Sequence, residues 1–251
     1  MLRSAAIASL ILILCGLIGC SSTPEEQALE DIRDTTIIPN LGSYDDGVQK
    51  EAVARMLNIL ETAPDVGANL LVASLRDPVH EDRTKMVCAW LLSTVRDRRA
   101  LPYLMTYLGQ GSNTGESLVR EAVSAYGASV LPSVTEVLEE GGDLARIAAA
   151  EVIFELGTRE AVDALVSRLD REPEARVRFL ILCGIASERP PRIAPLEKTL
   201  DDDDPSNREF AWDTLARAFK FPSWLTFDPQ AAPEVRRQQI ERYRAWRAGE
   251  G

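Results

Sequence analysis

Apolar residues recur along this chain with the spacing of amphipathic helices. Leu131, Val134 and Leu138, for example, lie on one face of a helix with about 3.6 residues per turn. No stretch combines sustained alternation of apolar and polar residues with β-branched side chains, which is the pattern of a half-buried strand. The chain is therefore predicted to be all-α.

Five segments of the chain share one form: an apolar helix ending in leucine, an acidic or glycine-containing turn, and an arginine opening a second helix. The repeat is 30 to 33 residues long, and only its second copy is stretched, by GQGSNTGES at 109–117. The leucines are Leu75, Leu108, Leu138, Leu169 and Leu200, and the arginines are Arg83, Arg120, Arg146, Arg176 and Arg208. Because stacked pairs bury each other's apolar faces, the period predicts a solenoid of about five helix pairs over residues 46–221.

The ends of these helices carry start signals. A first helix is expected over about 47–62, and second helices over about 80–95, 116–127, 143–156, 174–187 and 206–219. Asp46 and Asp143 are expected at helix starts, and Ser206 with Glu209 forms a capping-box pattern. Three prolines are predicted to lie in the opening turn of a helix, where proline is tolerated: Pro102, Pro132 and Pro195.

Helix pairs of this length resemble HEAT repeats, in the short variety first described in phycobilin lyases. The matching residues are Leu75-Arg76-Asp77-Pro78 with Arg83, Leu169-Asp170 with Arg176, and Leu200-Asp201 with Arg208. The resemblance implies a right-handed α-α solenoid in which the turn aspartate and the helix arginine of successive repeats form a buried ladder. Because the second and third turns offer glycine or glutamate instead of aspartate, we expect this ladder to be incomplete.

Aromatic and basic residues concentrate after the last repeat. Eight of the 15 aromatic residues lie between Phe210 and Trp246, and a final arginine-rich helix is expected over about 233–247. Residues 222–251 are therefore predicted to cap the exposed end of the solenoid. A second interpretation is a binding site, in which the rings of Trp224 and Phe227 contact a sugar or a peptide and Arg236 and Arg237 supply charge.

The first twenty residues have the form of a targeting signal. Arg3 precedes an apolar run from Ala5 to Ile18, which is shorter than the roughly 20 residues of a membrane-spanning helix. The run ends in Leu17-Ile18-Gly19-Cys20, which resembles the lipobox of bacterial lipoproteins. The resemblance implies that residues 1–19 are a signal peptide and that Cys20 carries a diacylglyceryl group. We therefore expect a lipid-anchored protein of the cell envelope, on the periplasmic side of the outer membrane if the cell is Gram-negative.

Residues 20–45 are polar and rich in turn formers, and are expected to be a lipidated tether that holds the body away from the membrane. Within it, Glu25 to Asp34 is compatible with a short acidic helix. Three apolar side chains, Ile37, Ile38 and Leu41, are candidates to dock on the first repeat.

Composition argues against several kinds of chemistry. The formal net charge of −11 disfavours nucleic acid, whose binding requires neutralisation of phosphates. The single histidine, His80, lies in an acidic turn and has no second histidine to share a metal. Residues 201–204 lack the glycine and glutamate of a calcium loop, and no phosphate-binding loop or hydrolase motif occurs. Cys88 and Cys183 lie two repeats apart and are expected to be buried thiols without a disulfide.

These features predict a non-catalytic, membrane-anchored scaffold that needs no metal and no cofactor beyond its lipid. It is expected to bind a protein partner through the concave surface lined by the second helices, an expectation that rests on the resemblance in fold. One alternative is a cell-wall or glycan-binding lipoprotein that uses the C-terminal aromatic segment. Another is a bilin-lyase-like enzyme, which the lipobox disfavours because it directs the chain out of the cytoplasm.

Overall fold

The computed structural model describes residues 23–110 and 116–249, and every regular element within them is a helix, which confirms the all-α prediction. The described residues belong to two compact units. Unit 1 contains the chain up to Tyr107 together with residues 117–126, and unit 2 contains Leu108–Glu116 and the chain from Gly127 onward. The predicted signal peptide (1–19) and the lipidation site Cys20 lie outside the described residues.

The helices that lie wholly or mainly in unit 1 are α2 (Pro24–Arg33), α3 (Ile37–Leu41), α4 (Asp46–Thr62), α5 (Pro64–Arg76), α6 (Asp82–Thr94), the 3₁₀ turn η1 (Arg98–Ala100), α7 (Leu101–Gln110) and α8 (Glu116–Ser124). Those of unit 2 are the 3₁₀ turn η2 (Gly127–Val130), α9 (Leu131–Glu140), α10 (Asp143–Leu156), α11 (Arg159–Arg168), the 3₁₀ turn η3 (Leu169–Arg171), α12 (Ala175–Ser187), α13 (Ile193–Thr199), α14 (Pro205–Phe219) and α15 (Pro233–Ala248).

The five second helices predicted from the repeat are α6, α8, α10, α12 and α14, and their ends agree with the prediction to within three residues. The prolines Pro102, Pro132 and Pro195 lie in the opening turns of α7, α9 and α13, as expected. The caps differ from the prediction. Asp45 and Asp204 accept the backbone N–H bonds at the starts of α4 and α14, in place of Asp46 and the Ser206 capping box, and Gly142 precedes α10 in place of Asp143.

In unit 1, the segment expected to be a tether is part of the folded body. Helices α2 and α3 pack against α4, and the side chains of Ile37, Ile38 and Leu41 are buried, which confirms their predicted docking. The Arg55 side chain on α4 fixes α2 with a 2.6 Å ion pair to Asp31. The tether prediction is therefore wrong for residues 24–41, because a long-range ion pair and apolar burial order a segment whose composition is that of a spacer.

The turn after α3 approaches α6 so closely that a side chain at position 42 would displace Thr84. A Cβ atom on Gly42 would lie 2.1 Å from the Oγ1 atom of Thr84. The backbone of the N-terminal segment therefore forms part of the packed interior of unit 1.

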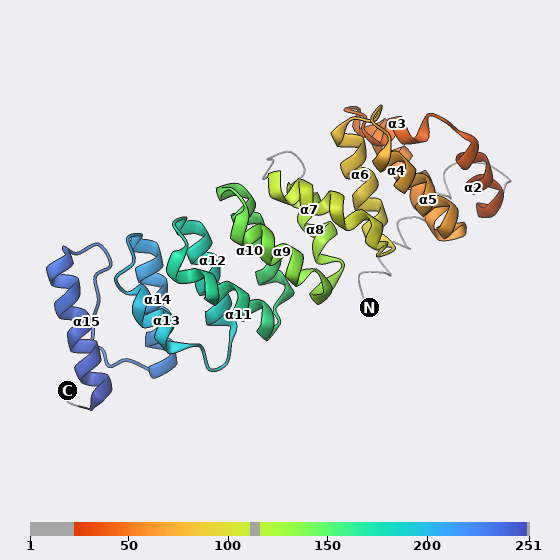
Figure 1. Ribbon diagram of the computed structural model, residues 1–251. Coiled ribbons are helices and arrows are strands. Elements are labelled where there is room, and N and C mark those ends of the chain that lie inside the picture. Colours follow the sequence, from red (N-terminus) through yellow and green to blue (C-terminus); the bar gives the residue numbers. More distant parts are fainter. Residues whose placement is uncertain (1–22, 111–115, 250–251) are drawn as a thin grey trace. The chain divides into compact units, whose positions relative to one another are not determined.

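In unit 2, three helix pairs follow one another along the chain: α9 with α10, α11 with α12, and α13 with α14 (Figure 1). Helix α10 also contacts α12, and α12 contacts α14, so the second helices form a continuous row in which each one packs against its neighbours. The stacking of helix pairs predicted from the repeat is thus present. Helix α15 follows α14 and carries buried Ile240 and Tyr243, in agreement with the predicted capping helix.

Candidate functional site

Three arginines of unit 2 occupy the same place in successive second helices. Arg146, Arg178 and Arg208 are the fourth residues of α10, α12 and α14. Each folds back along its helix so that its Nη1 group donates to the carbonyl oxygen five residues earlier. These oxygens belong to Gly141 (3.0 Å), Pro173 (2.8 Å) and Asp203 (2.9 Å). The shared geometry defines a structural row of arginines in unit 2.

Arg146 and Arg178 also bind the turn of the following repeat, and Arg208 binds the loop before α15. The clearest case is Arg178, whose Nε and Nη2 groups form a fork to the two carboxylate oxygens of Asp202, at 2.7 and 2.8 Å. Burial of Asp202 opposes its ionisation, but the hydrogen bonds from Arg178 and the backbone N–H of Asp204 outweigh this effect and lower its pKa. At the end of the row, Arg208 donates to the carbonyl oxygen of Pro229 at 2.9 Å, so a neutral acceptor replaces the carboxylate.

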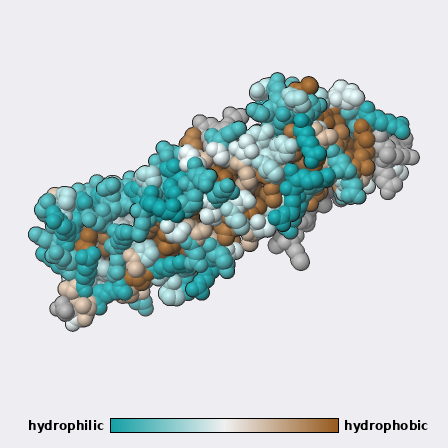
Figure 2. Space-filling view, in the orientation of Figure 1, coloured by the Kyte–Doolittle hydropathy of each residue, from teal (hydrophilic) through white to brown (hydrophobic). Residues whose placement is uncertain are grey.

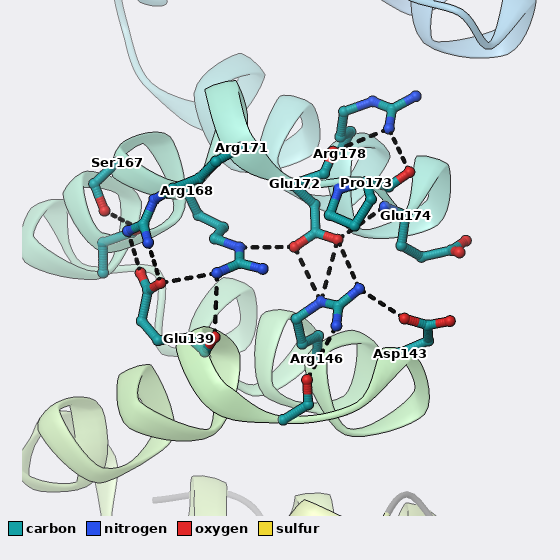
Figure 3. Close-up of polar contacts among 12 residues, drawn as sticks. Glu139, Asp143, Arg146, Ser167, Arg168, Arg171, Glu172, Pro173, Glu174 and Arg178 are labelled. Carbon is teal, nitrogen blue, oxygen red and sulfur yellow. Dashed lines mark hydrogen bonds and ion pairs between the residues drawn. The ribbon is translucent and has the colours of Figure 1, made fainter.

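The most buried charged group in contact with the arginine row is the carboxylate of Glu172. Its side chain is completely buried between two guanidinium groups (Figure 3). The Nε group of Arg146 lies 3.2 Å from both carboxylate oxygens, and the Nε group of Arg168 lies 2.8 Å from one of them. The backbone N–H of Glu174 donates to the same carboxylate at 2.9 Å. Two cations and an N–H group thus compensate one buried anion, as its burial requires.

The network continues from Arg168 to α9. Its Nη1 group donates to a carboxylate oxygen of Glu139 at 2.9 Å, and Arg171 binds that carboxylate at 2.6 Å. On the other side, Arg146 binds Asp143 at 2.8 Å. These contacts connect the α9–α10 turn with the α11–α12 turn, and they stabilise the fold rather than present a reactive group.

The prediction is wrong for the fourth arginine of the ladder. The prediction placed Arg176 in the row, but its side chain is 65% exposed and pairs with Glu151, and Arg178 takes the place instead. The cause is η3, which extends the first helix beyond Leu169 and shifts the start of α12 by one residue relative to its neighbours. Counting from the first residue of α12, Ala175, rather than from the leucine identifies Arg178 as the fourth residue of the helix.

The acidic partners implied by the resemblance are also displaced. Asp170 is 67% exposed and pairs with Lys198, and Asp201 is 68% exposed and lies 3.8 Å from Arg236. The carboxylates that reach the row are Glu172 and Asp202, one or two residues further along. In unit 1 the geometry differs again: the guanidinium of Arg83, the second residue of α6, lies 4.7 Å from the ring centre of Tyr44. Arg120 is half-buried in α8.

The C-terminal aromatic residues form a cluster around Trp212 of α14. Its ring contacts Phe221, Phe227 and Tyr243 at centroid distances of 4.8, 5.1 and 5.8 Å. The hydroxyl of Tyr243 donates to Glu197 of α13 at 2.8 Å. Burial and the hydrogen bond to Glu197 raise the pKa of Tyr243 to about 12. Helix α15 is therefore held on the last helix pair by ring packing and a buried hydroxyl.

The four residues suggested as a C-terminal binding site do not act as one group. Phe227 stacks on Trp212, and Arg236 folds back on the carbonyl oxygen of Ala231 at 2.7 Å, with its side chain 13% exposed. Arg237 is exposed and pairs with Glu234. Trp224 alone presents a largely free ring, 58% exposed. Two of the four residues thus belong to the cap, as the first interpretation predicted.

The thiols of Cys88 and Cys183 are free; Cys88 is fully buried and Cys183 is half-buried. Burial raises the pKa of Cys88 to about 12 and also raises that of Cys183, so neither is an activated nucleophile. Within the described residues, no group of three or more histidine, cysteine or carboxylate side chains is arranged to hold a metal ion, and His80 lies in the turn before α6. In the same part of the chain, no helix has the length and apolar character needed to cross a bilayer.

The outward side of the second helices is the remaining candidate surface. We define the second-helix face of unit 2 as the second, fifth, ninth and thirteenth residues of α10, α12 and α14, together with Phe210. Two contacts place these positions on one side of the row: Glu151 binds Arg176 at 3.0 Å, and Phe179 packs edge-on against Phe210 at 5.0 Å. The face comprises Leu144, Ile147, Glu151, Glu155, Arg176, Phe179, Cys183, Ser187, Ser206, Glu209, Phe210, Asp213 and Arg217, of which Ile147 is buried and the others are exposed or half-buried.

Large apolar side chains are exposed on this face. Leu144 is 52% exposed and Phe179 is 36% exposed. Elsewhere, the space-filling view shows hydrophobic residues that reach the surface between hydrophilic ones (Figure 2).

Comparison with known proteins gives no family for the chain, since no family model and no curated protein matches it.

Proposed function

We propose that this chain is a lipid-anchored, non-catalytic scaffold of HEAT-like helix pairs in a bacterial cell envelope, which binds a protein partner through its second helices. The observation that carries the proposal is the pair of exposed apolar side chains, Leu144 and Phe179, on the second-helix face of unit 2. Phe179 also packs against Phe210 of the neighbouring helix, and contiguous exposed apolar patches typically mark interaction sites. Arg146, Arg178 and Arg208 of the same helices are occupied in the arginine row, which supports a structural rather than a catalytic role for them.

The anchor is tested by fractionation. Cys20→Ser removes the only thiol that the lipobox offers for acylation, so the variant should leave the membrane fraction or remain as uncleaved precursor, and radiolabelled palmitate should no longer be incorporated. Continued labelling and membrane retention of a processed variant would overturn the anchor.

The binding face is tested by site-specific photo-crosslinking in intact cells. A photoreactive amino acid at position 144 or 179 should give a discrete crosslinked product. The same residue at Glu136 or Glu160, which are exposed on the first helices α9 and α11, should give none of that product. Equal products from both sets of positions would contradict the assignment of the second-helix face.

The glycan-binding alternative depends on Trp224, because Phe227 and Arg236 are engaged in the cap. Its test is Trp224→Ala. Since this ring is 58% exposed, the variant should keep the thermal stability of the parent. Loss of sedimentation with purified peptidoglycan at unchanged stability would favour the glycan-binding function over the scaffold.

A further inference from the structure

The second-helix face of unit 2 combines apolar side chains with an excess of carboxylates. On this face, the carboxylates are Glu151, Glu155, Glu209 and Asp213, and the guanidinium groups are Arg176 and Arg217. Arg176 is already paired with Glu151. The Nε group of Arg217 donates to the backbone oxygen of Asp213 at 3.2 Å rather than to a carboxylate.

The apolar part of the face lies across neighbouring helices. Phe179 of α12 and Phe210 of α14 are in edge-to-face contact, and Leu144 projects from the first turn of α10. Asp213 lies one helical turn after both Phe210 and Glu209, so the acidic groups border the aromatic pair through Asp213. A bound segment would therefore meet apolar and negative groups within two helical turns.

We propose that this face binds an amphipathic helical segment of a partner protein, with apolar side chains on Leu144, Phe179 and Phe210 and lysine or arginine side chains on Glu209 and Asp213. The inference rests on the proposed scaffold function and specifies the chemistry of its partner. Charge complementarity selects the occupant: an acidic segment would be repelled by the carboxylates, and an anionic membrane surface would be repelled for the same reason.

The test uses the full lipidated chain in nanodiscs of zwitterionic phosphatidylcholine, with empty nanodiscs as the blank. The probe is a fluorescent peptide of about 18 residues, or five helical turns, made of leucine and lysine with the leucines on one helical face. Two comparison peptides have the same leucine positions with glutamate in place of lysine, or the same composition in scrambled order. Anisotropy measures the affinity, and we expect only the amphipathic leucine–lysine peptide to bind tightly.

The variants locate the site. Glu209→Lys with Asp213→Lys should weaken binding about tenfold or more, because attraction becomes repulsion at two positions. Glu136→Lys with Glu160→Lys changes the net charge by the same amount on the exposed sides of α9 and α11, and should weaken binding less than about threefold. Leu144→Ser tests the apolar part without a change in charge and should also weaken binding.

Equal binding of the glutamate or scrambled peptide, or equal losses in the two double variants, would overturn the inference. So would binding of the protein to phosphatidylglycerol vesicles that depends on Leu144. The absence of any crosslink from position 144 would instead contradict the scaffold function itself. Crosslinks to a protein partner that persist in the Glu209→Lys, Asp213→Lys variant would retain the scaffold and overturn only the proposed chemistry.

Discussion

Loss of the Arg178 guanidinium tests the arginine row most directly. The side chain is 13% exposed and that of its partner Asp202 is 8% exposed. Arg178→Gln leaves this carboxylate uncompensated and removes the donor to the carbonyl oxygens of Glu172 and Pro173. Removal of one partner from a fully buried pair costs about 3–5 kcal/mol. Because this pair retains slight exposure, we expect the free energy of unfolding to fall by about 2–4 kcal/mol.

The matched control is Arg176→Gln, which makes the same chemical change two residues earlier on α12. Arg176 is 65% exposed and binds Glu151 at the surface. Exposed ion pairs contribute about 0.2–1 kcal/mol, so this variant should lose less than about 1 kcal/mol.

Urea unfolding followed by far-ultraviolet circular dichroism separates the two variants. With a slope of about 2 kcal/mol per molar urea, Arg178→Gln should lower the unfolding midpoint by about 1–2 M and Arg176→Gln by less than about 0.5 M. Adding Asp202→Asn to Arg178→Gln should restore part of the loss, because the uncompensated charge is then gone. Equal midpoints for the two single variants would refute the placement of Arg178 in the row.

Three further predictions concern other contacts. Glu172→Gln removes the anion between two arginines and should cost about 3 kcal/mol in the same assay; a loss below about 1 kcal/mol would contradict its role. Gly42→Ala should lower the free energy of unfolding by about 1–3 kcal/mol through overpacking. Gly109→Ala, where a Cβ atom meets nothing within 4 Å, should not lower it. Equal effects of the two variants would refute the close approach of Gly42 to Thr84. Hydrogen bonds from Thr36 and the pairing with Arg55 lower the pKa of Asp34 to about 2. The contribution of ionised Asp34 to the free energy of unfolding is present above its ordinary pKa and is lost as the pH falls from about 4 to about 2. Within this window, the free energy of unfolding should therefore depend less on pH in Asp34→Asn than in the parent protein. Parallel curves of unfolding free energy against pH would contradict this.

The helix pairs were predictable because their signals are local. The apolar period, the glycines before Asp143 and the proline at 132 lie within or beside the helices that they define. Burial of Ile37, Ile38 and Leu41 followed from the same reasoning, since apolar side chains in a polar segment need a surface to cover. The short acidic helix expected over Glu25–Asp34 is present as α2, but its attachment to α4 did not follow, because it depends on Arg55, which lies more than twenty residues away.

The arginine row shows where a repeat pattern loses accuracy. The spacing from leucine to arginine is a measure along the chain, whereas a ladder requires a fixed position on the helix. The two agree at Arg146 and Arg208 and disagree in the repeat where a 3₁₀ turn extends the first helix. The partners follow the same rule: Glu172 reaches Arg146 although the resemblance points to an aspartate, because reach and burial, not residue type, decide which carboxylate is bound.

Adjacent residues of α12 show how one helix contributes to both the arginine row and the second-helix face. Arg178 points into the turn of the next repeat, and Phe179 is exposed on the second-helix face. Successive residues of a helix differ in direction by a rotation of about 100°, so the arginine row and the second-helix face use different side chains. Substitutions at the row should therefore change unfolding without changing the chemistry of the face. Substitutions such as Leu144→Ser should do the reverse, which allows loss of binding to be separated from loss of fold.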